Sequence, residues 1–372
     1  MREIKRHMLA VVMLCLAFAA AGGAQTKPAG DDLQARVDER LGAAVKANQF
    51  SGAVLVARDG RVLVSKGYGM ANFETETPNT PQTIFRLGSI TKQFTATAIL
   101  MLQEQGKLSV QDSICKYVAD CPAAWQPITL HHLLSHTGGV PNFTSFPDYQ
   151  KTMALPTTVE GLIARFKDQP LDFQPGEKWS YSNSGYVLLG HVVEKVSGQS
   201  YEAFLQERIF APLGMKNTGY DHNATVLPRR AAGYMPQGNM MLNARYLDMT
   251  IPFSAGALYS TVEDLYLWDQ ALYTEKLLSK KSLDAMFTPV KNNYGYGWGI
   301  DTHQGLKRIA HSGGIDGFVT FIARYPEAKA VVIVLCNNMR SNPNAVAGDL
   351  AKLALADKMT PAATEKANPA KQ

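Results

Sequence analysis

The chain has 372 residues, of which 46% are hydrophobic and 19% charged, and its formal net charge is +5. This length and composition suit a globular protein with one large domain or two interleaved lobes and ample apolar material for a core. The positive charge is too small and too dispersed for a nucleic-acid-binding protein, so that class is excluded.

The first 24 residues have the three-part pattern of a secretory signal peptide. Arg2, Lys5 and Arg6 precede the apolar run MLAVVMLCLAFAAA, and small residues follow up to Ala24. This order predicts export to the periplasm or the cell exterior, with an uncleaved N-terminal anchor as the alternative. Residues 25–32 would form a polar linker. No later apolar run is long enough to span a membrane, so no stable span is expected after cleavage.

The first elements of the mature chain are predicted to be a helix, a β-hairpin and a second helix. Residues 33–48 carry apolar side chains at helical spacing. Two β-branched runs then flank Asp59-Gly60, which is a strong hairpin signal. A loop and a long apolar-faced helix opening with Ser89 follow within residues 85–105.

The middle and the end of the chain differ in pattern. From about 107 to 252, short helical runs alternate with loops, which predicts a mainly helical lobe. Another helix begins near Thr261, strands return after Pro289, and residues 344–357 form a closing helix. Residues 359–372 are polar and are expected to be a disordered tail.

This arrangement predicts an α+β fold. Strands from the N-terminal and C-terminal parts would form one antiparallel sheet flanked by helices, and the helical lobe would be an insertion. Residues 33–358 would then form a single domain. The cleft between the lobe and the sheet is where a site is expected.

Three cysteines of the mature chain have different expected states. Cys115 and Cys121 lie close together in an exported chain, which predicts a disulfide-closed loop, with two free thiols as the alternative. Cys336 ends the apolar run AVVIVLC and is expected in the core.

Ser89 and Lys92 are the first candidate catalytic pair. Three residues apart, they would lie on one face of a helix. An amine beside a hydroxyl can activate that hydroxyl as a nucleophile. The S-x-x-K spacing recurs at Ser113 and Lys116, but in a short segment without a preceding glycine. The alternative for Ser89 is an ordinary helix N-cap with a solvated lysine.

Tyr181 and Asn183 form the only Y-x-N in the chain and are the second candidate element. A lysine ammonium beside Tyr181 would favour its phenolate, which could accept the serine proton. Asn183 has both a donor and an acceptor, suited to holding Lys92 and a substrate amide. The alternative for Tyr181 is a half-buried loop tyrosine.

The third candidate element is His311-Ser312-Gly313-Gly314, which lies between two predicted strands. An edge strand beside a nucleophile can present a backbone N–H to a substrate oxygen, and with the N–H of Ser89 it would form an oxyanion hole. Glycines there permit close approach of the backbone.

In chain order these elements resemble the serine β-lactamase and penicillin-binding protein superfamily, in particular its class C-like branch. That branch includes class C β-lactamases, D-alanyl-D-alanine carboxypeptidases and family VIII esterases. The resemblance covers roughly residues 50–355, through FRLGSITKQFTA, ITLHHLLSHTGGVP, WSYSNSGYVLLG, SAGALYSTVEDLYLW, YGYGWGI and HSGGIDGF. It implies the following roles: Ser89 as acylated nucleophile, Lys92 as its proton partner, Tyr181 as general base, Asn183, His311, Ser312 and Gly313 as substrate-binding residues, and the backbone N–H groups of Ser89 and Gly314 as the oxyanion hole.

The third motif departs from the K-T-G that class C β-lactamases usually carry. His311 is neutral or partly charged near neutral pH, so it anchors a substrate carboxylate less firmly than lysine would. We therefore expect an exported serine hydrolase acting on an ester, amide or peptide-like substrate through a Ser89 acyl-enzyme. The alternatives are a true class C-like β-lactamase and a sensor that binds penicillin or muropeptides without turnover. No cofactor is expected, and the oligomeric state stays open.

Two rival sites remain. Ser312 lies in A-H-S-G-G, which approaches the G-x-S-x-G elbow, but a predicted strand follows it where that elbow needs a helix. His132 and His136 have the spacing of a metal-binding H-E-x-x-H, but Leu133 occupies the glutamate position. Two loop-ordering histidines are the preferred interpretation, and no metal is expected.

Overall fold

The computed structural model describes residues 29–359. The predicted signal peptide, residues 25–28 of the linker and residues 360–372 of the tail lie outside this range. Residues 29–32 were assigned to the linker, which is wrong, because helix α1 spans Ala29–Lys46. Its apolar stripe packs on the sheet. Between residues 29 and 359, no helix is both long and apolar enough to cross a bilayer.

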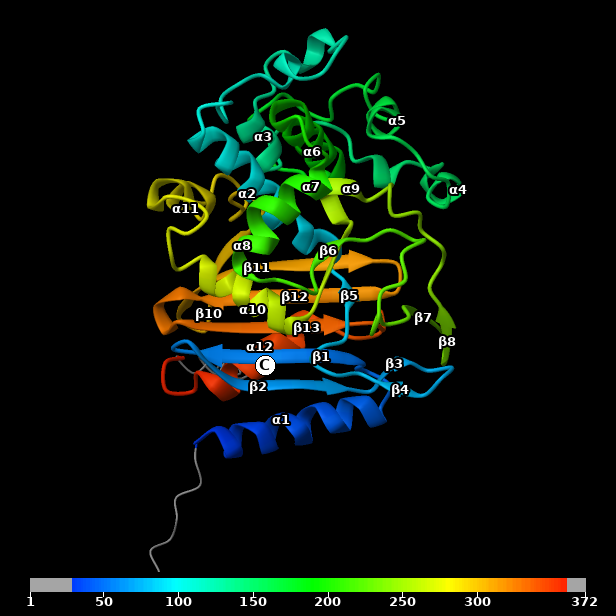
Figure 1. The fold of residues 1–372 in the computed structure, drawn as a ribbon, viewed down its shortest axis with the longest axis vertical. Coiled ribbons are helices and arrows are strands. Elements are labelled where there is room, and N and C mark those ends of the chain that lie inside the picture. Colours follow the sequence, from blue (N-terminus) through cyan, green and yellow to red (C-terminus); the bar gives the residue numbers. More distant parts are fainter. Residues whose placement is uncertain (1–28, 360–372) are drawn as a thin grey trace, which may run out of the picture.

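A six-stranded antiparallel sheet is the centre of the fold and confirms the predicted class (Figure 1). The strand order is β10-β11-β12-β13-β1-β2, so the N-terminal hairpin lies beside the last strand of the chain. Asp59 and Gly60 both have positive φ, 52° and 73°, as a two-residue hairpin turn requires. The strands are β1 (Gly52–Arg58), β2 (Arg61–Tyr68), β10 (Gly299–His303), β11 (Leu306–Ile315), β12 (Phe318–Tyr325) and β13 (Ala330–Cys336).

Helices cover both faces of this sheet. Helices α1 and α12 (Pro343–Ala354) pack on one face, and α10 (Val262–Ala271) packs on the other, beside the helical lobe (Figure 1). Because side chains of a strand alternate between faces, the continuous apolar run of β13 serves two cores. Cys336, at its end, is buried, as predicted.

The lobe is mainly helical, as predicted, but it also contains the short strands β6, β7 and β8. Its α-helices are α3 (Leu130–Leu134), α4 (Tyr149–Thr152), α5 (Val159–Ala164), α6 (Asn183–Ser197), α7 (Tyr201–Leu205), α8 (Ala211–Leu213) and α9 (Phe253–Gly256), with α11 (Lys280–Met286) later in the chain. The smaller strands are β3 (Met70–Asn72), β4 (Thr77–Pro78), β5 (Phe85–Arg86), β6 (Gly219–Tyr220), β7 (Tyr234–Gln237), β8 (Met240–Asn243) and β9 (Leu258–Ser260). Cys115 and Cys121 are joined by a disulfide, with Cα atoms 5.2 Å apart.

Helix α2 (Thr91–Glu104) connects the lobe to the sheet and positions the site. Almost all of its residues are buried, including Lys92 and Gln93. It contacts α6 and α9 of the lobe, and the short turn before it contacts β11. A polar side chain on a helix so enclosed must find its partners inside the protein.

Candidate active site

Ser89 lies in a short 3₁₀ turn, Gly88–Ile90, directly before α2, and not in the first turn of an α-helix as expected. Gly88 has φ +55°, and a Cβ there would lie 2.8 Å from the backbone nitrogen of Gly314. A side chain at position 88 is therefore excluded both by conformation and by space. This glycine lets the backbone before Ser89 approach the strand that carries Gly314.

Lys92 is fully buried and points at Ser89. Its Nζ lies 3.2 Å from Ser89 Oγ and donates to Asn183 Oδ1 and to the carbonyl oxygen of Ala255, both at 2.8 Å. Burial lowers the pKa of this amine well below its usual value. The alternative of a solvated surface lysine is therefore wrong.

Tyr181 completes the contact with Ser89, because its hydroxyl donates to Ser89 Oγ at 2.7 Å. The Lys92 Nζ also lies over the Tyr181 ring, 4.7 Å from the ring centroid. Burial raises the pKa of Tyr181, and the Ser89 contact only partly opposes this. The two shifts together favour the neutral forms of Tyr181 and Lys92, and not the phenolate beside an ammonium that the sequence suggested.

His136 holds the loop that carries Tyr181. Its carbonyl oxygen accepts from the N–H of Ser180 at 3.0 Å, and its Nδ1 accepts from the N–H of Ser182 at 3.2 Å. His136 has φ +59°, which turns the chain so that both acceptors face this loop. Burial lowers the pKa of His136 well below its usual value, which keeps Nδ1 free to accept. The loop-ordering interpretation therefore agrees with the geometry.

Asn183 is held on both sides of its amide. Its Oδ1 accepts from Lys92, and its Nδ2 donates to Thr144 Oγ1 at 3.1 Å. Its backbone N–H donates to Asn142 Oδ1 at 3.1 Å. The side chain thus has a fixed orientation at the start of α6, and its expected contact with Lys92 is present.

The third motif lies on the part of β11 that extends past its neighbour. Pairing with β10 ends at Ala310, so residues 311–315 pair only with β12 and leave their other edge open toward the turn of Ser89. A Cβ on Gly313 would lie 1.9 Å from the carbonyl oxygen of Leu87, so this close approach requires glycine. The open edge is what an oxyanion-hole strand needs.

His311 is neutral in this setting. Burial first, and then the charge of Lys92, lower the pKa of His311 to about 4. Its Nδ1 lies 2.6 Å from the carbonyl oxygen of Ser312 and must donate to it, so Nε2 accepts from the hydroxyl of Tyr294 at 2.9 Å. Both ring nitrogens are used internally, and His311 provides no positive charge for a substrate.

We expect this histidine to make the protein acid-sensitive. Between pH 6.5 and 4 the unfolded chain binds a proton at His311 that the folded chain does not, so stability is lost as pH falls through this window. The loss amounts to roughly 3 kcal/mol of unfolding free energy. Urea titrations at pH 7, 5.5 and 4 on the wild type and on His311→Asn measure it. Equal pH dependence in the two proteins would contradict the assignment.

Two cavities adjoin the hydroxyl groups of Ser89 and Tyr181. The first, of about 160 Å³, is lined by Ser89, Asn183 and Gly314 and by apolar side chains such as Phe143. The second, of about 400 Å³, is lined by Tyr181, His311 and Ser312. Because the two hydroxyls are 2.7 Å apart, a substrate could place one group on each side of the nucleophile.

The remaining candidates from the sequence, Ser113 and the His132–His136 pair, do not form a second active site or a metal site. Ser113 caps a short 3₁₀ turn and donates to the carbonyl oxygen of Gln126. Helix α3 ends at Leu134, so His132 and His136 do not share a helix face. The described residues contain no cluster of His, Cys, Asp or Glu side chains able to hold a metal.

Sequence reasoning missed three partners of the site. The carbonyl oxygen of Ala255 binds Lys92, Thr144 binds Asn183, and Tyr294 binds His311. Ala255 lies in the run SAGALYSTVEDLYLW and Tyr294 begins YGYGWGI, but both are far in sequence from their partners. A backbone carbonyl carries no residue signal, so only the side chain of Tyr294 could have been suspected from its motif.

Comparison with known proteins gives concordant results. A family model described as Beta-lactamase matches residues 33–357. Penicillin-binding protein 4* of Bacillus subtilis is 32% identical over 317 residues, which cover 78% of this chain and 68% of that protein. The solved octameric penicillin-binding protein homologue from Pyrococcus abyssi has a TM-score of 0.78 and 31% identity, over 88% of this chain and 79% of that one. A D-stereospecific amidohydrolase from Streptomyces sp. has a TM-score of 0.73 and 27% identity, over 84% and 97%.

Proposed function

Since the chain belongs to the beta-lactamase family, we propose that it is an exported enzyme that cleaves an ester, amide or peptide-like bond through an acyl-enzyme on Ser89. A serine hydrolase is the coarse assignment that the family supports. The acyl-enzyme, the substrate class and export are the parts that we propose. One observation supports the acyl-enzyme above the others: Ser89 Oγ lies between Lys92 Nζ and the Tyr181 hydroxyl, at 3.2 and 2.7 Å.

The hydrogen bonds of Lys92 indicate which group removes the serine proton. A neutral amine has two N–H donors and one lone pair. Asn183 Oδ1 and the Ala255 carbonyl oxygen accept from the two donors, which leaves the lone pair for Ser89. Since burial lowers the pKa of Lys92 well below its usual value, it favours this neutral form. Ser89 then donates to Lys92 while it accepts from Tyr181.

The proposed reaction has two steps. Ser89 Oγ bonds to the substrate carbonyl carbon, its proton moves to Lys92, and the carbonyl oxygen becomes an oxyanion. When the oxyanion collapses, the bond to the leaving group breaks and the leaving group takes a proton from the Tyr181 hydroxyl, which Lys92 restores. Water then attacks the ester on Ser89 with the same groups transferring its proton.

The oxyanion would be held by backbone groups. The N–H of Ser89 and the N–H of Gly314 are the candidates, brought close by Gly88. Backbone donors fixed in place are effective because they need no rearrangement as charge develops. Substitution of side chains leaves these donors intact, so we expect some activity to survive substitutions elsewhere in the site.

The uncharged third motif limits the range of substrates that the site can bind. Because His311 is neutral, the third motif has no positive charge that could bind a substrate carboxylate. This favours esters and amides, including D-amino acid derivatives, over substrates that depend on a carboxylate anchor. The amidohydrolase named above, at 27% identity, supports the amide part of the proposal.

A substrate panel on the exported form of the protein tests the proposal. It contains a short-chain p-nitrophenyl ester, a D-alanine amide, a D-alanyl-D-alanine peptide and a chromogenic cephalosporin. We expect multiple turnovers on the ester and the amide, with kcat/KM about 10²-fold or more above that for the cephalosporin, since each lost charged contact is worth about 1.5–3 kcal/mol.

Other outcomes would point to the alternatives. Preferential cephalosporin turnover would indicate a β-lactamase. A single stoichiometric labelling of Ser89 without turnover would indicate a sensor. Export is tested separately, by finding whether the chain in its native host is recovered outside the cytoplasm and shortened after Ala24.

A further inference from the structure

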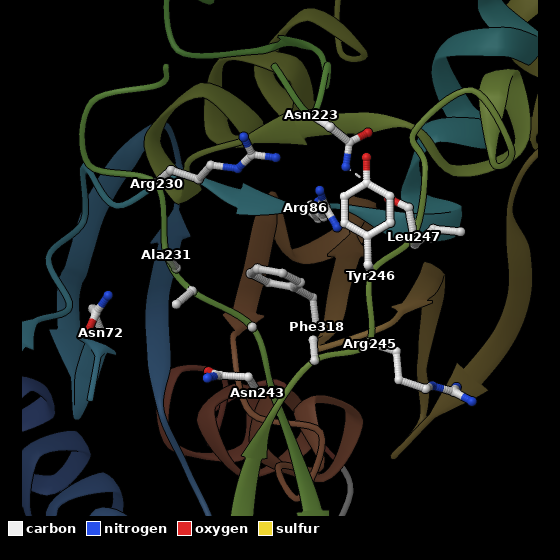
Figure 2. Close-up of a pocket in the computed structure, with 13 residues that line it drawn as sticks. Asn72, Arg86, Asn223, Arg230, Ala231, Asn243, Arg245, Tyr246, Leu247 and Phe318 are labelled. Atoms are coloured by element: carbon white, nitrogen blue, oxygen red, sulfur yellow. Dashed lines mark hydrogen bonds between the residues drawn. The ribbon is translucent and has the colours of Figure 1, made fainter. Parts of the chain in front are cut away.

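A third open cavity, of about 490 Å³, lies beside the catalytic cavity lined by Ser89 and is lined by an unusual set of side chains (Figure 2). We call it the arginine pocket. Arg86, Arg230 and Arg245 line it, together with three asparagines, two aromatic residues and small residues, and no Asp or Glu lines it. A concave surface with several cations and no lining carboxylate attracts anions.

Two of the guanidinium groups are fixed from behind by one carboxylate. Asp221 is fully buried and accepts from Arg86 Nε at 2.7 Å and from Arg230 Nη2 at 2.6 and 2.7 Å. One negative charge facing two positive charges leaves this group of three with a net charge of +1. The pairing also fixes both arginines in place, so binding an anion would cost little side-chain entropy.

Arg86 keeps donors for a ligand. Among residues 29–359, its only hydrogen bond uses Nε, so the four N–H groups of its two Nη atoms have no protein acceptor. Its side chain is 13% exposed. Figure 2 shows Arg86 among the residues that line the pocket. These Nη atoms are not among the fully buried donors without a partner, so water can reach them, and an anion could take its place.

The wall shared with the catalytic cavity is also ordered. Leu247 lines both cavities. Arg245 pairs with Asp316 at 2.7 Å, and Asp316 lines the catalytic cavity and not the arginine pocket. Asn223 fixes the loop of Tyr246, since its Nδ2 donates to the carbonyl oxygen of Leu247 at 3.0 Å. A ligand in the arginine pocket would thus lie next to a bound substrate.

We propose that the arginine pocket is a binding site for an oxyanion, a carboxylate or a phosphate, separate from the groups that act on Ser89. Guanidinium groups suit both anions because their paired N–H donors match two oxygens. The Tyr246 and Phe318 rings would contact the apolar part of the ligand. The volume of about 490 Å³ exceeds what a bare anion needs, so the oxyanion belongs to a larger molecule.

Calorimetric titration of the full protein with inorganic phosphate and with glutarate tests this proposal, at constant ionic strength to hold screening fixed. Neutral glutaramide is the matched uncharged probe. We expect saturable binding of at least one oxyanion at one site per chain and none of glutaramide. Tighter binding of phosphate or of glutarate then assigns the chemistry of the natural ligand.

Two variants place the binding in the pocket. Arg230→Gln and Arg245→Gln are each expected to weaken it by about 10-fold or more, the effect of a lost charge-assisted hydrogen bond. Arg40→Gln is the matched control, because Arg40 is 52% exposed and paired with Asp349, much as Arg245 is 53% exposed and paired with Asp316. Arg245 is exposed, so its variant tests the pocket even where Arg230→Gln unfolds.

The proposal is overturned by absent binding of both oxyanions to the wild type, or by equal loss in the Arg40 and Arg245 variants. The measurement uses no turnover. It can therefore be repeated on Ser89→Ala, where binding is expected to persist whatever the outcome for the proposed hydrolase.

Discussion

Ser89→Ala is expected to lower kcat/KM for a p-nitrophenyl ester by about 10⁴-fold or more, as removal of a serine nucleophile does. The reason is that Ser89 Oγ is the hydroxyl in contact with both Lys92 Nζ and the Tyr181 hydroxyl. A methyl group in its place leaves both partners intact but gives no atom to acylate. Steady-state kinetics and mass measurement of the trapped acyl-enzyme check the result.

Two serines serve as controls. Ser113→Ala, from the second S-x-x-K, should leave the rate unchanged, since its hydroxyl only caps a turn. Ser312→Ala tests the rival nucleophile and should retain far more activity than Ser89→Ala. Activity lost in Ser312→Ala but kept in Ser89→Ala would reverse the assignment.

Lys92→Met is expected to lower the rate by about 10²–10⁴-fold, the usual contribution of a general base. The methionine side chain is similar in length to that of lysine and fits a buried position, but it has no amine that could accept a proton. Lys92→Arg is the informative partner, because arginine is always charged and cannot be deprotonated. If the lone pair of Lys92 is what matters, the arginine variant should be as slow as the methionine variant.

The pH dependence of the rate in the wild type also tests whether Lys92 is the base. Since burial lowers the pKa of Lys92, its basic form is present above this lowered pKa and is lost as pH falls through it. The rate should therefore rise with pH through the folded pKa of Lys92 and already be high well below its ordinary value near 10.5. High activity of Lys92→Arg would instead support a Tyr181 phenolate beside a cation. Thermal unfolding of each variant separates loss of catalysis from loss of fold.

Much of the fold followed from local patterns. Asp59-Gly60 specified the hairpin, and the apolar run ending in Cys336 specified a strand buried on both faces. The linker boundary at residue 32 is wrong because α1 begins at Ala29, and its first residues, AGDD, carry none of the apolar side chains that mark its stripe from Leu33 onward. The short strands inside the lobe were missed because two- to four-residue strands have too few positions to show alternation.

The candidate site was likewise only partly predictable from the sequence. The motifs identified the side chains that meet, because S-x-x-K, Y-x-N and H-x-G fix residue types at positions the fold brings together. They did not reveal the Ala255 carbonyl, the His136 contacts or the arginine pocket. In each of these, the contacting groups come from segments tens of residues apart or from the backbone, for which one sequence carries no local signal.

The sequence by itself determined which groups are candidates for chemistry: Ser89 as the proposed nucleophile, with Lys92 and Tyr181 as its proposed partners. The tertiary structure decided in which direction their pKa values shift. Burial removes water from Lys92, Tyr181 and His311 and disfavours the charged form of each, so their pKa values shift in directions that no spacing of residues encodes. An uncharged Lys92, which we propose as the base, and an uncharged His311 are favoured only in the packed site, because desolvation exists only once distant segments have closed around these groups.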